Sequence, residues 1–197
     1  MDIVVAHDFS CGWCYIGLQQ VKQMLTEFPV RFEWRSFELY PEPMPFDSPS
    51  APAEKPNPDR PKTPSRFSLA LAAQGMELPR ITRPSDIRTR NAHLAALYAA
   101  SKGDPLPYIE RIYRAYWEEG MDINNLETLV ELGASFGFST SELRTSIETG
   151  EFAHHITPFD LEAYQAGVYN LPTFWIGGER YAEQPITVLR KAIQACL

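Results

Sequence analysis

The chain has 197 residues, of which 44% are hydrophobic and 22% are charged, and its formal net charge at pH 7 is −7. This length suits one domain, or one domain with a large insertion, around a full hydrophobic core. Because nucleic acids and anionic membranes bind basic surfaces, an acidic chain with scattered Lys and Arg disfavours both as partners.

No apolar run reaches the roughly 18 residues of a membrane-spanning helix. The N-terminus also has no basic segment ahead of an apolar one, so it does not have the pattern of a signal peptide. We therefore expect a cytosolic protein. Structural disulfides are uncommon in the cytosol, where a close cysteine pair is more often catalytic or metal-binding.

The first forty residues predict a strand, a helix and a second strand. Residues 2–8 form a short β-rich run that suits a buried strand. Apolar residues then recur at helical spacing from Leu18 to Phe28, which predicts a helix over about 11–27. Residues 30–39 alternate apolar and charged side chains, which is the period of a strand. This βαβ order places the sequence Cys-Gly-Trp-Cys, residues 11–14, at the first strand-to-helix junction.

The middle of the chain changes character. Residues 41–64 contain nine of the 17 prolines, so we expect an irregular, exposed segment there. From about residue 65 to residue 167 the patterns are nearly all helical, with helices predicted at 65–75, at 107–120 and from Asn124 onward. Ser139 and Glu142 have the spacing of a capping box that begins a further helix. Pro158 is expected to break or kink the last helical stretch.

Strand character returns near the C-terminus. Thr173 to Ile176 predicts a strand, Gly177-Gly178 a hairpin turn, and residues 180–182 a short partner strand. Residues 185–197 then close the chain as a helix with one apolar side. The expected order is βαβ, a helical block and ββα.

Cys11 and Cys14 have the spacing of a redox pair. A thiol at a helix N-terminus has its thiolate stabilised by unpaired N–H groups and by the helix dipole, and Cys11 is expected to lie there. Cys14, one turn along, is close enough to attack a mixed disulfide formed on Cys11. The spacing thus provides an attacking and a resolving thiol for two-electron thiol–disulfide exchange.

Chance and metal binding are the alternatives for this pair. Accidental spacing is uncommon for three cysteines in a chain of this length, and rarer at a strand-to-helix junction. A structural zinc ion needs four nitrogen or sulfur ligands. With no second cysteine pair, the four histidines His7, His93, His154 and His155 would have to converge on it. We therefore predict no metal site.

Leu171-Pro172-Thr173, at the start of a predicted strand, is the second informative stretch. A proline cannot donate to the hydrogen-bond ladder of a central strand. A cis peptide bond beside a site would explain its presence, and an ordinary proline at a strand start is the alternative.

Together these features resemble the DsbA family of thiol–disulfide oxidoreductases, within which the FrnE-like branch is nearest. That branch is related to 2-hydroxychromene-2-carboxylate isomerases and kappa-class glutathione transferases. The resemblance is carried by CGWCYIG (11–17), RSFELYP (35–41), NAHLAALYA (91–99), RAYWEEGMDI (114–123) and GVYNLPTFWIGG (167–178). It implies an α/β fold with a thioredoxin-like βαβ…ββα core, interrupted by a mostly α-helical inserted domain. Residues 1–45 and 158–197 would form the two parts of the core, and residues 46–157 the Pro-rich segment and the insertion.

The resemblance also assigns roles to individual residues. It implies that Cys11 is the attacking thiol and Cys14 the resolving thiol, with Gly12 and Trp13 between them tuning the redox potential. Relatives often have Pro where this chain has Gly12. Leu171 and Pro172 resemble the cis-proline loop that offers backbone groups to a substrate, and Thr173 follows it. His93 matches a position on a helix that faces the cleft, with a hydrogen-bonded core or surface histidine as the alternative.

The same resemblance concerns partners and cofactors. It implies a disulfide- or thiol-containing protein or small molecule as substrate, no bound cofactor, and glutathione as a candidate co-substrate. Two other functions compete with disulfide exchange. One is a glutathione-dependent isomerase of small aromatic substrates, a branch in which Ser is usual at position 11. The other is a non-catalytic peptide-binding module.

Several polar residues have simpler interpretations. We expect Cys196 to be a small packed or fraying cysteine of the last helix, and His154-His155 to be a solvated pair. Glu33, Arg35 and Glu38 alternate along a central strand. One of them is a candidate proton acceptor for the buried thiol, with a salt bridge or edge exposure as the alternative.

Overall fold

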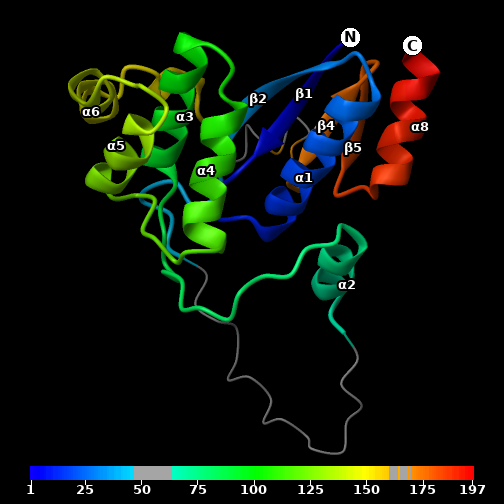
Figure 1. Ribbon diagram of the computed structural model, residues 1–197, viewed down its shortest axis with the longest axis horizontal. Helices are drawn as coiled ribbons and strands as arrows, with labels where there is room; N and C mark the ends of the chain where they lie inside the picture. Colours follow the sequence, from blue (N-terminus) through cyan, green and yellow to red (C-terminus); the bar gives the residue numbers. More distant parts are fainter. Residues whose placement is uncertain (47–63, 160–163, 165–167, 169) are drawn as a thin grey trace, which may run out of the picture.

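The computed structural model describes residues 1–46, 64–159, 164, 168 and 170–197. Within these residues the sheet has the strand order β3-β2-β1-β4-β5. The central strand β1 (Asp2–His7) pairs in parallel with β2 (Arg31–Glu38) and antiparallel with β4 (Thr173–Ile176). β4 continues antiparallel into β5 (Glu179–Ala182). The N-terminal and C-terminal parts of the chain therefore build one sheet (Figure 1).

Two helices pack against this sheet. α1 (Gly12–Glu27) connects β1 to β2, and α8 (Ile186–Cys196) follows β5. Apolar side chains of the sheet, such as Val5 and Phe174, meet Val21 and Met24 of α1 and Leu189 of α8 in one buried cluster. This core holds the C-terminal half of α1 against the sheet, whereas Cys14, Tyr15 and Leu18 near its N-terminal end are buried together with residues of the helical insertion.

The insertion between β2 and β3 is helical. It contains α2 (Arg66–Ala73), α3 (Arg90–Lys102), α4 (Leu106–Trp117), α5 (Leu126–Ala134) and α6 (Thr140–Thr149), then a single 3₁₀ turn at Ala153–His155. In Figure 1, α3 to α6 lie together beside β2, whereas α2 lies below α1.

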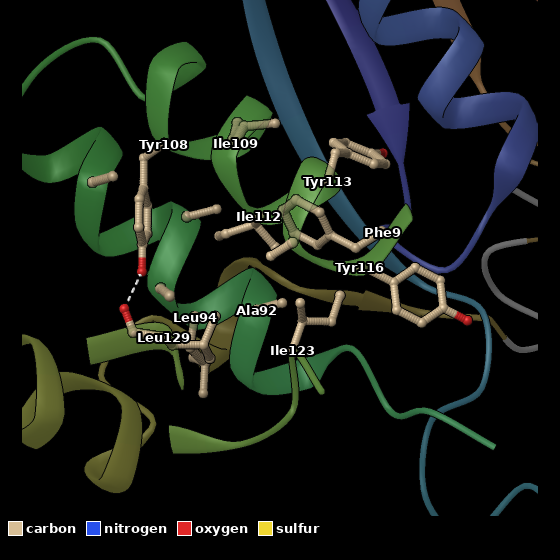
Figure 2. Packing of buried hydrophobic residues seen from close by; sticks show 14 of the residues in the cluster. Phe9, Ala92, Leu94, Tyr108, Ile109, Ile112, Tyr113, Tyr116, Ile123 and Leu129 are labelled. Carbon is tan, nitrogen blue, oxygen red and sulfur yellow. Dashed lines mark hydrogen bonds between the residues drawn. The ribbon is translucent and has the colours of Figure 1, made fainter. Parts of the chain in front are cut away.

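A second buried cluster joins the helical block to the sheet. It includes Phe9, which directly follows β1, together with Ile112 and Tyr113 of α4 and Leu94 of α3. Figure 2 shows the Phe9 and Tyr113 rings side by side next to the end of β1. Burial of apolar surface on this scale is the main force that holds the insertion against the sheet.

Most sequence-predicted elements are confirmed, with two corrections. The helix expected from Asn124 is capped instead by Asn125, whose side chain accepts a hydrogen bond from the Thr128 N–H. Pro158 does not interrupt a helix. It lies in the two-residue strand β3 (Thr157–Pro158), which pairs in parallel with β2 at the edge of the sheet, where a proline needs no ladder partner.

Three expectations keep their status as predictions. Residues 47–63 of the Pro-rich segment lie outside the described residues, as does Gly167 at the end of the predicted helical region. The division of the chain at residues 45/46 and 157/158 is untested, and its second boundary falls inside β3. In the described part of the chain, no helix combines the length and apolar character needed to cross a membrane.

Candidate functional site

Cys11 is the N-cap of α1, as the sequence predicted. Its backbone is extended, with φ −81° and ψ 113°, and its carbonyl oxygen accepts the N–H groups of Cys14 at 3.0 Å and Tyr15 at 3.2 Å. The Cys11 side chain is only partly buried. The Cys11 side chain therefore lies at the N-terminal end of α1 and is partly open to solvent, although it makes no capping hydrogen bond to the helix.

Cys14 differs sharply from Cys11, because its side chain is only 1% exposed. The Asp8 N–H donates to its sulfur at 3.5 Å. Burial raises the pKa of the Cys14 thiol well above the ordinary value, and the adjacent Cys11 raises it further. All three cysteines of the chain are free thiols. The pair thus combines an accessible sulfur with a buried one that keeps its proton until a base removes it.

The Leu171–Pro172 loop lies directly against the pair, although it is 160 positions away in the sequence. The Leu171–Pro172 peptide bond is cis. The Cys11 thiol donates to the Leu171 carbonyl oxygen at 3.6 Å, and the Glu183 N–H donates to the Pro172 carbonyl oxygen at 2.9 Å. Thr173 is fully buried and its hydroxyl donates to the Asn170 carbonyl. The structure therefore brings Leu171 and Pro172 to the cysteines and places Thr173 in the sheet.

Gly17 permits this approach of the proline loop to α1. A Cβ atom at this position would lie 2.8 Å from Cγ of Pro172, closer than real Cβ atoms approach other atoms. We expect Gly17→Ala to lower the free energy of unfolding by about 1–3 kcal/mol, because the proline ring would have to move. Urea unfolding would measure this change, with Gln19→Ala on the same helix as a control. An unchanged midpoint for Gly17→Ala would contradict the contact.

Gly12 and Trp13 are covered by α2. A Cβ atom on Gly12 would lie 2.7 Å from the Phe67 ring, and the Trp13 ring meets Phe67 edge to face at 5.5 Å. The Arg66 guanidinium lies 4.9 Å from the centre of the Trp13 ring, a cation–π distance. Phe67 had no signal in the sequence, because contact between α2 and the motif depends entirely on tertiary packing.

A groove of about 580 Å³ runs beside the pair. Its walls come from α1, α2, the proline loop and the start of α8, and they include Trp13, Ile16, Leu69, Pro172 and Ile186. Leu69 is 57% exposed. The groove therefore offers apolar surface beside Trp13 of the motif and Pro172 of the proline loop, as a binding site for a substrate with an apolar portion requires.

The Asp8 carboxylate is buried close to the cysteine pair. Asp8 directly follows β1. Ser10 donates to it from both its N–H (2.7 Å) and its hydroxyl (2.6 Å), the Leu39 N–H donates at 3.0 Å and the Thr89 hydroxyl at 2.7 Å. Burial raises the pKa of Asp8, but its contacts with His93, Ser10 and Thr89 outweigh this effect and hold the pKa below its usual value. Asp8 is therefore a satisfied anion that organises the loop after β1.

His93 is part of this buried layer. Its side chain has no exposed surface and its Nε2 lies 3.5 Å from Oδ2 of Asp8, but neither ring nitrogen has a hydrogen-bond partner among the described residues. His93 is therefore a core histidine, but without the hydrogen bond that this alternative expected. Direct substrate contact, which the resemblance implied, would require this part of the core to open, and it stays a prediction.

The remaining candidate residues lie away from the Cys11–Cys14 pair. Cys196 is exposed, with its sulfur against the Gly177 turn, and His154 and His155 are exposed with ring centroids 4.0 Å apart. Glu33 and Arg35 are exposed, whereas Glu38 is 2% exposed and lies 3.9 Å from Arg90. Burial raises the pKa of Glu38. Within the described ranges, no cluster of three or more His, Cys, Asp or Glu side chains could hold a metal ion.

Two residues at the site were missed as candidates. Asp8 was not singled out, although an acidic residue that ends a buried strand three positions before Cys11 is a usable signal. Tyr113 was interpreted only as part of an apolar stripe. Its ring is fully buried in the core, yet its hydroxyl donates to the Asp8 carbonyl oxygen at 3.0 Å and lies 3.0 Å from Nδ1 of His7. Helical periodicity cannot reveal this, because it predicts which face is buried and not which polar atom lies at its end.

Comparisons with known proteins agree with this architecture. A family model described as the DSBA-like thioredoxin domain matches residues 2–194. A probable DsbA oxidoreductase from Streptomyces coelicolor has a TM-score of 0.72 at 22% identity, with 99% of this chain and 89% of that chain covered. These matches confirm the predicted α/β thioredoxin-like fold with a helical insertion, α2 to α6, between β2 and β3.

Two further solved structures have the same fold. A 2-hydroxychromene-2-carboxylate isomerase has a TM-score of 0.69 at 14% identity, with 100% of this chain and 96% of that chain covered. The cytosolic disulfide reductase DsbM from Pseudomonas aeruginosa has a TM-score of 0.68 at 17% identity, with 99% of this chain and 100% of that chain covered. A second structure of DsbM is with GSH. At these identities the likeness concerns the fold alone.

Proposed function

Because the chain belongs to the DSBA-like thioredoxin domain family, we propose that it is a thiol–disulfide oxidoreductase with Cys11 as the attacking and Cys14 as the resolving thiol. The observation that carries the proposal is the asymmetry of the pair. Cys11 is partly exposed at the N-terminus of α1, whereas Cys14 is buried one turn further along. Of these two sulfurs, only that of Cys11 can meet a substrate sulfur directly, and Cys14 is placed to displace the substrate thiol from Cys11.

In the reducing direction, the Cys11 thiolate attacks one sulfur of a substrate disulfide, and the other substrate sulfur leaves as a thiolate. Cys14 then loses its proton and attacks the sulfur of Cys11. The second substrate thiol is released and a Cys11–Cys14 disulfide remains. Two electrons have passed from the pair to the substrate, and two molecules of a thiol such as glutathione restore the pair by the reverse chemistry.

The remaining parts of the site fit this sequence of steps. The Leu171 carbonyl and the cis-proline loop offer backbone groups to a substrate segment beside Cys11. Gly12 and Trp13 lie between the two sulfurs in sequence and are candidates for tuning the potential. A disulfide- or thiol-containing protein or small molecule is the proposed substrate. The presence of GSH in a structure of DsbM supports glutathione as co-substrate.

Placement in the FrnE-like branch and a cytosolic location are part of the same proposal. DsbM, which shares this fold, is a cytosolic disulfide reductase, and this supports a cytosolic location here. Residue 11 argues against the isomerase alternative. This chain has Cys there, where Ser is usual in that branch, and Cys14 is also present. The peptide-binding alternative gives no role to a thiol pair with unequal burial.

Cys14→Ser tests the proposal. Without the resolving thiol, a mixed disulfide on Cys11 persists, so we expect this variant to retain covalent partners or one glutathione per chain after exposure to a disulfide. Non-reducing electrophoresis and intact-mass measurement would detect the adduct, which a reductant should release. Cys196→Ser, which changes a thiol remote from the pair, should release its adduct as the unchanged protein does. A Cys14→Ser variant that traps nothing would contradict the assignment.

A further inference from the structure

Arg66 of α2 and Glu183, which follows β5, place opposite charges on the wall of the groove beside the cysteine pair. Nη2 of Arg66 lies 3.7 Å from Oε2 of Glu183, which is longer than a hydrogen bond. The second arginine in this wall, Arg190, is already bound to Glu27 and Gln23. The guanidinium of Arg66 and the carboxylate of Glu183 therefore keep hydrogen-bonding capacity for a ligand.

Both residues contact the immediate surroundings of Cys11. The Arg66 guanidinium lies 4.9 Å from the centre of the Trp13 ring, two positions after Cys11. The Glu183 N–H donates to the Pro172 carbonyl oxygen at 2.9 Å, and the carbonyl of the residue before this proline accepts the Cys11 thiol at 3.6 Å. A disulfide held between Arg66 and Glu183 is therefore near the sulfur that is proposed to attack it.

Glu183 has an unusual backbone conformation. Its φ is 49°, and among the described residues it is the one non-glycine residue with a positive φ. Glycine would occupy this left-handed region without a steric penalty. The ion pair with Arg66 offers little compensation, because the Arg66 side chain is 75% exposed and exposed ion pairs contribute little to stability. Strain of this kind is typical of functional sites, so ligand binding explains the Glu183 side chain better than folding does.

We propose that Arg66 and Glu183 select small disulfides that carry a free α-amino-acid group, such as cystine and glutathione disulfide. The inference rests on the proposed function, whose substrate class it narrows. In an α-amino-acid group the ammonium nitrogen and the carboxylate oxygens lie about 3 Å apart, which is close to the 3.7 Å between the two side chains. The carboxylate of the ligand binds the Arg66 guanidinium, and its ammonium group binds the Glu183 carboxylate. Two charge-assisted, hydrogen-bonded pairs thus replace one long ion pair.

The groove has the dimensions of a small-molecule site. Its volume is about 580 Å³, within the range of pockets that bind small ligands. α2 forms one wall and the start of α8 contributes to another, and both present apolar side chains, Leu69 and Ile186. A small disulfide can therefore place its methylene groups against these walls while its charged group meets Arg66 and Glu183.

Rapid mixing of the reduced protein with four matched disulfides tests this selection. Cystine carries both charges, cystamine only the ammonium groups, 3,3′-dithiodipropionate only the carboxylates, and 2-hydroxyethyl disulfide neither. Acid quenching followed by mass measurement of the remaining free thiols records the oxidation of the Cys11–Cys14 pair. Because the four disulfides differ in intrinsic reactivity, the quantity compared is the second-order rate constant of a variant divided by that of the unchanged protein, for the same disulfide.

At neutral pH we expect Arg66→Gln to lower this rate constant on the order of tenfold for cystine and 3,3′-dithiodipropionate, because each loses a charge-assisted hydrogen bond. Glu183→Gln should cause a similar loss for cystine and cystamine. Neither variant should change the rate constant for 2-hydroxyethyl disulfide. Glutathione disulfide, measured alongside cystine, separates the two sources of the amino-acid group, because the preferred ligand shows the greater loss.

Glu183→Gly separates binding from folding. Glycine accepts the positive φ, so we expect this variant to unfold at a higher urea concentration than the unchanged protein and still to react more slowly with cystine. Arg31→Gln and Asp2→Asn are the matched controls. They remove the same charges from an exposed ion pair at the start of β1, whereas Cys11 lies beyond the end of that strand. Both controls should react with every disulfide as the unchanged protein does.

Three outcomes overturn the selection. Equal ratios for charged and neutral disulfides would mean that the variants only shift α2. Equal losses in the Arg31→Gln and Asp2→Asn controls would mean long-range attraction without a binding site. A lower urea midpoint for Glu183→Gly would mean that Glu183 serves stability. If no disulfide oxidises the pair in the unchanged protein, the proposed function itself fails, whereas its reaction with 2-hydroxyethyl disulfide upholds that function whatever the charge variants do, so the two failures are distinguishable.

Discussion

Replacing Cys11 with Ser is expected to abolish thiol–disulfide exchange, with a loss on the order of 10³-fold or more. A serine hydroxyl is a far weaker nucleophile than a thiolate at neutral pH and cannot form a disulfide. Cys14 cannot substitute for it, because the Cys14 side chain, in the first turn of α1, is only 1% exposed and a substrate disulfide cannot reach its sulfur. The measurement is the rate of glutathione-dependent reduction of a small disulfide, compared with the unchanged protein.

Cys196→Ser provides the control for this experiment. It removes a thiol that is exposed and lies against the Gly177 turn, away from the proline loop. Full activity in Cys196→Ser together with background activity in Cys11→Ser would assign the chemistry to one sulfur. Activity retained by Cys11→Ser would contradict the proposed function. Turnover of an aromatic isomerase substrate by that variant would point to the isomerase alternative.

Asp8→Ala should cause the largest loss of stability, about 3–5 kcal/mol in the free energy of unfolding. The carboxylate is fully buried and accepts hydrogen bonds from Ser10, Leu39 and Thr89. Its removal leaves several buried donors without an acceptor, and each costs free energy. Chemical denaturation would measure the loss. Asp2→Ala is the control, because the exposed Asp2–Arg31 ion pair should contribute less than about 1 kcal/mol.

The same carboxylate predicts a pH dependence. Its pKa in the folded state lies below its ordinary value. A group whose pKa is lowered by folding stabilises the protein above its unfolded pKa of about 3.9, and this contribution is lost as pH falls through the lower folded-state pKa. The stability of the unchanged protein should therefore fall more steeply in this acidic range than that of Asp8→Asn, which has no proton to bind at this position. Parallel curves for the two proteins would contradict the assignment.

Sequence reasoning was most accurate where local patterns determine structure. Helical spacing after Cys14, the alternation in residues 30–39 and the Gly177-Gly178 turn predicted α1, β2 and the β4–β5 hairpin. Sequence reasoning was wrong where contacts with other parts of the chain determine the local structure. Pro158 became part of an edge strand because β2 offered it a partner, and Asn125 rather than Asn124 became the cap of α5.

By itself, therefore, the sequence determined the order of the elements and the position of Cys11 at a helix N-terminus, because these depend on residues within about two helical turns of one another. Only the tertiary structure decided what surrounds the sulfurs. Tyr113 meets the end of β1 across more than a hundred positions, and Leu171 reaches Cys11 across 160. Such contacts depend on how the helical insertion packs on the sheet. The periodicity of apolar residues does not predict which polar atoms this hydrophobic packing brings together.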